Sequence, residues 1–494
     1  MINIDTRHKS LACQVTELAR TVRLAIDWML AAVLAGCAVG PDYQVPATTL
    51  GPFHNAQQVS GQSASAAPPL DKWWVGFNDP VLNRLIERAL DQNLDLAAAI
   101  ARTQQARAAA QAAGAQLLPT LDATAQATAL HQSLNSPLGQ VAPILPGYTR
   151  DQRLYDLGGA ASWEIDLAGG LRRGAQAARA EVQAAKAALA GTRITVAADV
   201  ADAYFQIRGN QSRISYVQEQ IEVDAHLLAL VVQLRGRGLA NDRELSQAQA
   251  VLQQAQAALP PLRIALESQL NRLDVLLAAQ PGTYAAELAA FRDIPDIPAI
   301  PSSDTPTDFL RRRPDIVAAE RRLAASNANI GAALSEYYPK LSLSGLVGFE
   351  SLNTHNLLKS ASFQPSATGA IRWRIFDFGK VDAEVKQARG ANAEALAQYR
   401  QTVLHAAEDV ENAFVSLTQT EARTGRLQDE ITSLRRSRDL SQQAFSAGAI
   451  PLTDVLDADR QLLVAQDDLA LNRAAAARAA VLSFRALGGG WAPP

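Results

Sequence analysis

Cysteine and methionine are almost absent from this chain of 494 residues. The two cysteines are Cys13 and Cys37 and the two methionines are Met1 and Met29, so residues 38–494 contain neither amino acid. No disulfide can form within that stretch, and no pair of thiolates is available there to bind zinc. We therefore expect its stability to come from packing and from assembly with other chains.

Long hydrophobic runs and a strong charge of either sign are also missing. The longest apolar candidate lies around residues 28–35, which is about half of the roughly 20 residues that a membrane-spanning helix needs. If the chain crosses a membrane, we expect it to do so with β-strands. The net charge of −3 gives no reason to expect a nucleic-acid partner.

Motifs for catalysis are absent as well. No glycine-rich loop that could hold a phosphate group precedes a helix, and the six histidines are scattered along the chain: His8, His54, His131, His226, His355 and His405. We therefore predict that the chain is not an enzyme, with no catalytic residue, no metal site and no cofactor other than covalently attached lipid.

The first residues indicate an export signal. Arg20 and Arg23 precede an apolar run that ends in Leu34-Ala35-Gly36-Cys37. This pattern predicts a lipoprotein signal peptide over residues 1–36, although the true translation start and signal length stay open. The Cys37 thiol would carry a diacylglycerol group, and the new amino terminus at Cys37 would carry an N-acyl chain. Residues 37–80 would then form a lipidated, extended N-terminal segment. Alternatively, Cys37 is a buried cysteine in an ordinary apolar helix. Ala38 favours the outer membrane, because an aspartate there would suggest retention at the inner membrane.

The rest of the chain contains two similar halves. Residues 93–119 align with residues 313–339 at an offset of 220, and Trp163 with Trp373 at an offset of 210. A proline-rich stretch at residues 281–306 separates the halves. We therefore predict an internal duplication, with repeats at residues 81–280 and 307–488 and a C-terminal tail at residues 489–494.

Each repeat contains two stretches in which apolar residues occupy the odd-numbered positions. These stretches are residues 121–129, 155–165, 341–349 and 367–375. The alternation predicts one β-hairpin at residues 119–166 and another at residues 340–376, with polar loops at about 134–154 and 352–365. A soluble antiparallel sheet with one wet face would show the same alternation, so this alternative stays open.

Four strands of this length can cross a bilayer when the strands are tilted, but they cannot close a barrel. In hydrocarbon each unpaired backbone group at an open edge costs several kcal/mol, so other copies must complete the sheet, and three copies give twelve strands. Helical stretches at residues 171–235 and 381–447 contain no proline and would each be about 100 Å long. Helices of that length next to a membrane hairpin favour the wall of a tube over a globular domain.

Several motifs resemble a known family, the NodT-type lipoproteins among the TolC-like outer membrane factors of resistance-nodulation-division efflux pumps. The motifs are Cys37-Ala38-Val39-Gly40-Pro41-Asp42-Tyr43 with Pro46; Trp73-Trp74 with Phe77, Asp79-Pro80 and Leu82; Arg313-Pro314-Asp315 with Ala319-Glu320-Arg321; and Tyr338-Pro339 with Leu341. The resemblance implies an α+β membrane protein of a Gram-negative cell. It would be a homotrimer with a twelve-stranded outer-membrane β-barrel, four strands per chain, continuous with a long periplasmic α-helical barrel.

The resemblance also implies a function and partners. The protein would be a passive exit duct for small molecules, lipid-anchored in the outer membrane, that works with a periplasmic adaptor protein and an inner-membrane pump. An exit duct for protein secretion would use the same architecture and stays open. A periplasmic coiled-coil adaptor lipoprotein would share the lipid and the long helices, but it would not need two matched hairpins. The transported compound and the partner pump stay open.

In that family, acidic side chains from three protomers narrow the periplasmic opening, next to turns between paired helices. The matching residues here are Asp454 and Asp457, which lie three apart on a helix expected to begin near Pro451, and the turn glycines Gly238 and Gly448. A threefold axis would turn each aspartate into a ring of carboxylates that attracts cations. Alternatively, the two acids only stabilise a helix N-terminus. The sequence does not decide whether the periplasmic end of the channel is open or closed.

Overall fold

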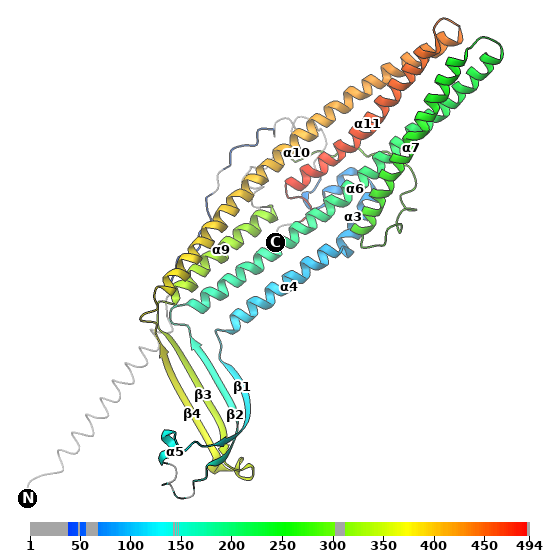
Figure 1. Cartoon of the computed structure of the whole chain (residues 1–494). Helices are drawn as coiled ribbons and strands as arrows, with labels where there is room; N and C mark the ends of the chain where they lie inside the picture. The colour runs from blue at the N-terminus through cyan, green and yellow to red at the C-terminus, as the bar shows by residue number, and fades with distance from the viewer. Residues whose placement is uncertain are drawn as a thin grey trace, which may run out of the picture. The chain divides into compact units, whose positions relative to one another are not determined.

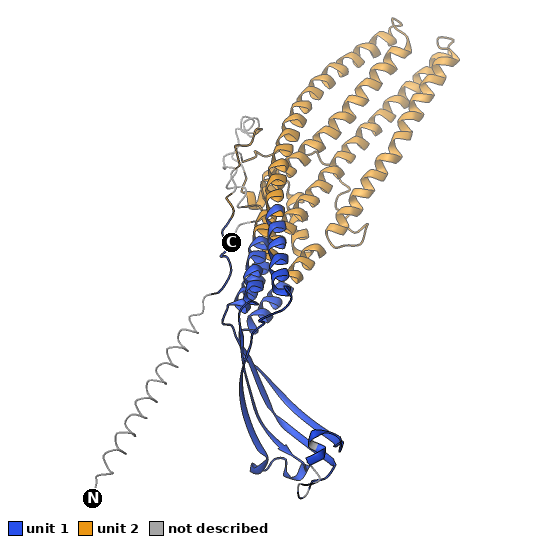
Figure 2. Ribbon diagram, turned by 60° about the vertical axis from the view of Figure 1, so that its left-hand side comes forward, with its two compact units in different colours: residues 1–45, 105–182, 321–397 blue, residues 46–104, 183–320, 398–494 orange. Residues whose placement is uncertain are grey.

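The computed structural model describes residues 38–47, 50–55, 68–141, 144, 146, 148–301 and 312–491. The expected signal peptide and Cys37 lie outside these residues. The chain forms two compact units, coloured separately in Figure 2. Unit 1 comprises residues 1–45, 105–182 and 321–397, and unit 2 comprises residues 46–104, 183–320 and 398–494.

Unit 1 contains a four-stranded antiparallel sheet whose strands follow one another in chain order (Figure 1). The strands are β1 (Thr120–His131), β2 (Asp151–Ile165), β3 (Lys340–Ser351) and β4 (Phe363–Arg372). Short helices lie in the connections: α5 (Pro137–Val141), η3 (Thr354–Asn356) and η4 (Ser360–Ser362). Each repeat therefore supplies one pair of strands, as the alternation predicted.

The register places the odd-numbered apolar residues of all four strands on one face. Leu121 pairs with Ala161, Leu157 with Phe349, and Leu341 with Ile371. Directly paired residues of an antiparallel sheet point to the same side, so the apolar positions form a continuous face. This face is open in the single chain, where Leu121 is 78% exposed and Ile371 is 73% exposed.

The strand limits differ from the prediction at three places. β2 begins at Asp151, inside the loop predicted at residues 134–154, and β4 begins at Phe363, inside the loop predicted at residues 352–365. β4 also ends at Arg372, before the apolar Trp373 and Ile375. The start of β2 looked like loop because Asp151, Gln152 and Arg153 are polar on both faces, and the start of β4 because it contains Pro365. Pro365 is tolerated within β4 because an edge strand does not need every backbone donor.

The helices show the duplication in their lengths. Helices α4 (Leu94–Ala115) and α9 (Pro314–Ser335) have 22 residues each, α6 (Gly170–Gly236) and α10 (Lys380–Ser446) have 67, and α7 (Asp242–Leu276) and α11 (Leu452–Ala486) have 35. The prediction of two long unbroken helices is therefore confirmed. Among the residues that the structure describes, no helix has both the length and the apolar character needed to cross a membrane.

Aromatic residues build the core of unit 2. Three of them, Trp73, Trp74 and Phe77, come from the 3-10 helix η1 (Leu70–Phe77), which precedes α3 (Pro80–Gln92), and the others come from α6, α10 and α11. Trp73 stacks on Phe484 of α11 with ring centroids 5.4 Å apart. Asp79 caps α3 by accepting a hydrogen bond from the backbone N–H of Val81 at 2.8 Å, and the Tyr204 hydroxyl donates to the same carboxylate. The motif around Trp73 and Asp79 thus has a structural role.

Candidate functional site

Two tight turns join the long helices in pairs, α6 to α7 and α10 to α11 (Figure 1). Gly238 and Gly448 lie in these turns, and both have φ of +73°, a left-handed conformation that favours glycine. The N–H of Gly238 donates to the Arg235 carbonyl and that of Gly448 to the Phe445 carbonyl, both at 2.9 Å. The backbone N–H of the next residue, Leu239 or Ala449, donates to the carbonyl five residues earlier in the chain. Both turns are therefore Schellman motifs.

Helix α11 begins directly after the second turn. Pro451 is its N-cap residue and Asp454 lies in its first turn, as predicted. The Asp454 carboxylate accepts a hydrogen bond from the Thr453 hydroxyl at 3.3 Å. Asp457 lies one turn further on, where its two oxygens accept from Arg460 at 2.9 Å and from Gln461 at 2.6 Å. Both aspartates are on the surface of the single chain.

The two aspartates therefore differ in how their charge is balanced. Arg460 neutralises Asp457 within the chain, whereas the helix N-terminus is the positive end nearest to Asp454. The Asp457–Arg460 pair is exposed and is worth about 0.2–1 kcal/mol, so it can open at little cost. A role in stabilising the start of α11 and a role in a carboxylate ring are both compatible with this geometry.

Apolar clusters hold this end of the helices together. One joins α6, α7 and α11, and another joins α10 and α11: Leu227, Val231, Ala248, Leu452 and Val455 in the first, and Leu427, Ile431, Leu462, Ala465 and Leu469 in the second. Arg213 of α6 also forms a two-pronged ion pair with Asp467 of α11, at 2.6 and 3.1 Å. The start of α11 is therefore fixed by packing on three other helices.

Two buried carboxylates interrupt this packing, and reasoning from the sequence missed both. Asp224 of α6 is 2% exposed and Asp459 of α11 is 3% exposed. A heptad pattern could have found them, because both stand where apolar residues recur at spacings of three and four. The buried positions are Val217, Gln220, Asp224, Leu227 and Val231 in α6, and Leu452, Val455, Asp459, Leu462, Gln466 and Leu469 in α11.

Burial changes the acidity of both groups. Burial raises the pKa of the Asp459 carboxyl to about 6; the positive charge of Arg438 opposes this shift, and the negative charges of Asp224 and Asp439 add to it. Burial also raises the pKa of the Asp224 carboxyl, against a hydrogen bond of 2.7 Å from Gln220 to its Oδ1. The charge of Asp224 thus disfavours ionisation of Asp459.

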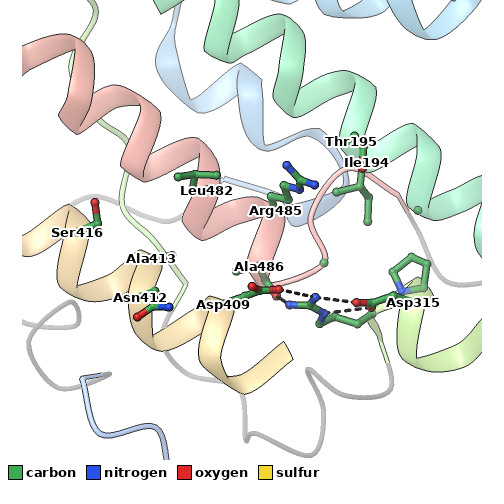
Figure 3. A pocket seen from close by; sticks show the side chains of 14 residues that line it. Ile194, Thr195, Asp315, Asp409, Asn412, Ala413, Ser416, Leu482, Arg485 and Ala486 are labelled. Atoms are coloured by element: carbon green, nitrogen blue, oxygen red, sulfur yellow. Dashed lines mark hydrogen bonds and ion pairs between the residues drawn. The ribbon is translucent and has the colours of Figure 1, made fainter. Parts of the chain in front are cut away.

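A separate cavity of about 750 Å³ in unit 2 surrounds the Arg313-Pro314-Asp315 motif (Figure 3). Arg313 forms ion pairs with Asp315 at 2.7 Å and with Asp409 at 2.9 Å, and it donates to the Ala486 carbonyl at 3.1 Å. Burial lowers the pKa of Arg313, but its bonds to the two carboxylates outweigh this and raise the pKa. Arg313 therefore ties the start of α9 to α10 and to the end of α11.

The segment after Cys37 is anchored to unit 1. Arg173, which is 6% exposed, donates to the Val39 carbonyl at 3.2 Å and forms an ion pair with Asp42 at 2.9 Å. Gly40 has φ of +100° and lies so close to Gly331 that an added Cβ would come within 2.5 Å of the Gly331 Cα. Cys37 itself lies outside the described residues.

Potential metal ligands do not converge in the parts of the chain that the structure describes, where no group of three histidine, cysteine, aspartate or glutamate side chains could hold an ion.

Comparisons with known proteins agree with these features. The family model described as outer membrane efflux protein matches residues 85–279 and again residues 305–489. The chain is 33% identical over 451 residues to the pyoverdine export outer membrane protein OpmQ of Pseudomonas putida, covering 90% of this chain and 93% of that protein. It is 30% identical over 443 residues to nodulation protein T of Rhizobium leguminosarum bv. trifolii, covering 89% and 91%. The structure of the outer-membrane channel OprN superposes with a TM-score of 0.85 at 33% identity, covering 92% of this chain and 100% of that one.

These similarities confirm the resemblance seen in the sequence motifs. They also confirm the mixed fold with its internal duplication, because the family model matches once in each half. The proteins that the chain resembles are efflux and channel proteins. The limits predicted for the repeats, the linker and the tail stay predictions, as do the roles of Asp454, Asp457, Gly238 and Gly448.

Proposed function

The chain belongs to the outer membrane efflux protein family and is an outer-membrane efflux channel, and from this premise we propose that three copies form the exit duct of a tripartite pump. The observation that carries the proposal is the sheet. Among the described strands, β1 and β4 each pair on one side only, while one face of the sheet is apolar and exposed. Neighbouring copies would complete the edges, and lipid would cover the apolar face.

The duct would act with a periplasmic adaptor protein and an inner-membrane pump, and it would catalyse no reaction. The relative OpmQ is named for the export of pyoverdine and the relative TtgI for the efflux of toluene. We propose small molecules, such as drugs or other toxic compounds, as the cargo here too. The pump would select the cargo, because a passive duct passes what it receives.

We propose Cys37 as the site of the lipid anchor. The contacts of Arg173 with Val39 and Asp42 support this, because they hold the chain only a few residues beyond the cysteine. An acyl chain at Cys37 would therefore be tethered close to unit 1, which contains the sheet. The diacylglycerol and the N-acyl chain would add to the attachment that the strands provide.

We propose that Asp454 and Asp457 form cation-binding rings at the periplasmic opening, beside the Gly238 and Gly448 turns. A threefold axis would bring three copies of each carboxylate together, where like charges repel and a multivalent cation binds. Asp454 would contribute more of the field than Asp457, because Arg460 balances Asp457 within the chain.

Single-channel recording in planar bilayers tests these rings. Trivalent cations added from the periplasmic side should block the wild-type channel, and Asp454→Ala/Asp457→Ala should be largely insensitive. The matched control Asp429→Ala/Glu430→Ala removes the same charge from exposed positions of α10 and should be blocked like wild type. Of the single variants, Asp454→Ala should weaken block more than Asp457→Ala. Equal block of the double variant and the wild type would show that the two aspartates are ordinary helix-start residues.

A further inference from the structure

A second pocket in unit 2, of about 450 Å³, lies among α6, α7 and α11, and its lining includes Asp457, one of the two proposed ring aspartates. Its size is within the range of pockets that hold small organic molecules, roughly 300–1,000 Å³. Residues that matter for its chemistry are Gln220 and Asp224 from α6, Gln247 and Val251 from α7, and Leu463 and Val464 from α11.

Two buried acceptor oxygens from different helices belong to residues that line this pocket. The Oδ2 atom of Asp224 and the Oε1 atom of Gln247 have no hydrogen-bond partner among the described residues. Asp224 is 98% buried, since only 2% of its surface is exposed. A buried acceptor without a donor is destabilising, and more so when it is charged, so the pocket favours a ligand that donates hydrogen bonds.

The charges around the pocket favour a positive ligand. Its lining contains three charged residues, Asp224, Asp457 and Arg460, and the last two form an ion pair with each other at 2.9 Å. The charge of Asp224 is thus left without a counter-ion at the buried end. Asp459 lies close enough for the charge of Asp224 to raise the pKa of its carboxyl, and it is not a counter-ion for Asp224.

The remaining walls are largely apolar. Val251 and three alanines come from α7, and Leu463 and Val464 from α11; Val464 is 58% exposed in the single chain. We propose that this pocket binds an amphiphilic organic cation, whose ammonium or guanidinium group donates to Asp224 and Gln247 while its apolar part lies against α7 and α11. The geometry thus assigns the efflux channel a ligand site of its own.

Binding should depend on pH, because only the ionised Asp224 supplies the counter-charge. Burial raises the pKa of this carboxyl. Affinity should therefore rise as the pH rises through that raised pKa and then level off. Two other charged residues, Asp457 and Arg460 of α11, line the pocket. Asp459 of α11 lies nearby, and Arg438 and Asp439 of α10 act on its carboxyl.

Fluorescence titration of the detergent-purified full-length protein with dansylcadaverine tests the site. This probe joins a primary ammonium group to an aromatic body, and its N-acetyl derivative keeps the body without the charge. The wild-type protein should bind the amine at least roughly tenfold more tightly than the acetylated probe, because a hydrogen bond to a charged group is worth about 1.5–3 kcal/mol. Equal affinity for the two probes, or no binding of the amine, would overturn the proposal.

Two matched variants locate the binding. Asp224→Asn has nearly the same shape and keeps an acceptor for Gln220, and it should weaken binding of the amine at least roughly tenfold. Glu222→Gln removes the same charge two residues away on the exposed face of α6 and should bind like wild type. Binding that survives Asp224→Asn would refute the assignment. Because the readout is affinity and not conductance, a failure here would leave the proposed duct and its gate untouched.

Discussion

Replacing Asp459 with asparagine should stabilise the packing of α11, and the gain should depend strongly on pH. Asp459 occupies a buried heptad position of α11 and is 3% exposed. Its ionised form is therefore poorly solvated, and the nearby Asp224 and Asp439 add repulsion. Asparagine keeps the shape and a polar group but cannot ionise, so it removes the charge without leaving a cavity.

The magnitude follows from the pKa of Asp459. This pKa is raised from 3.8 to about 6, so the folded state holds the proton more tightly than the unfolded state does. The resulting loss of folding stability is small at pH values below the pKa of the unfolded state, and it reaches its full size above the pKa of the folded state. By proton linkage it is well under 1 kcal/mol at pH 4 and about 3 kcal/mol at pH 7.5. The advantage of the asparagine variant should therefore grow by about 2 kcal/mol between these pH values, or roughly 30-fold in the opening equilibrium.

Hydrogen–deuterium exchange of the detergent-purified protein measures this opening locally. Protection of the α11 backbone amides around residue 459, corrected for the intrinsic pH dependence of exchange, reports the free energy of opening this segment. Asp459→Asn should raise protection far more at pH 7.5 than at pH 4. The control Asp454→Asn changes an exposed acid at the N-terminus of the same helix, and it should lower protection slightly, by about 0.3–1 kcal/mol. An equal gain at both pH values would refute the assignment of a raised pKa to Asp459.

Two further predictions concern the anchor and the assembly. Cys37→Ser should abolish incorporation of labelled fatty acid while the trimer still forms, because the strands supply most of the membrane-buried surface; normal labelling of this variant would remove Cys37 as the anchor. Mass measurement of the purified protein in detergent should give a trimer, because both edges of the four-stranded sheet need partners. A stable monomer with intact strands would contradict the shared sheet.

The sequence alone predicted the kinds of elements and their order. Alternation at odd positions showed the two hairpins, because successive side chains of a strand point to opposite faces. The lack of proline over residues 171–235 and 381–447 allowed the long helices that α6 and α10 form. The duplication was visible as a repeated pattern, and it reappears in the matching lengths of the paired helices.

The ends of the strands depended on tertiary structure. β4 runs from Phe363 because β3 offers a pairing partner as far as Phe349, although the residues between Phe363 and Pro365 look like loop. Backbone hydrogen bonds to a neighbouring strand stabilise a strand end whatever the polarity of its exposed side chains. A pattern within one strand cannot show how far its neighbour extends.

In the candidate site, too, the sequence decides some features and only the tertiary structure decides others. The sequence placed Asp454 and Asp457 on one helix face near Pro451, because helical spacing is a local property. Spacing alone did not decide that Arg460 forms an ion pair with Asp457, since Arg460 could equally have contacted another helix. Heptad spacing marks Asp224 and Asp459 as core positions, but the packing of α6 against α11 decides whether a cation or a second acid lies opposite. Only the tertiary structure brings these two carboxylates together, and burial then raises the pKa of both.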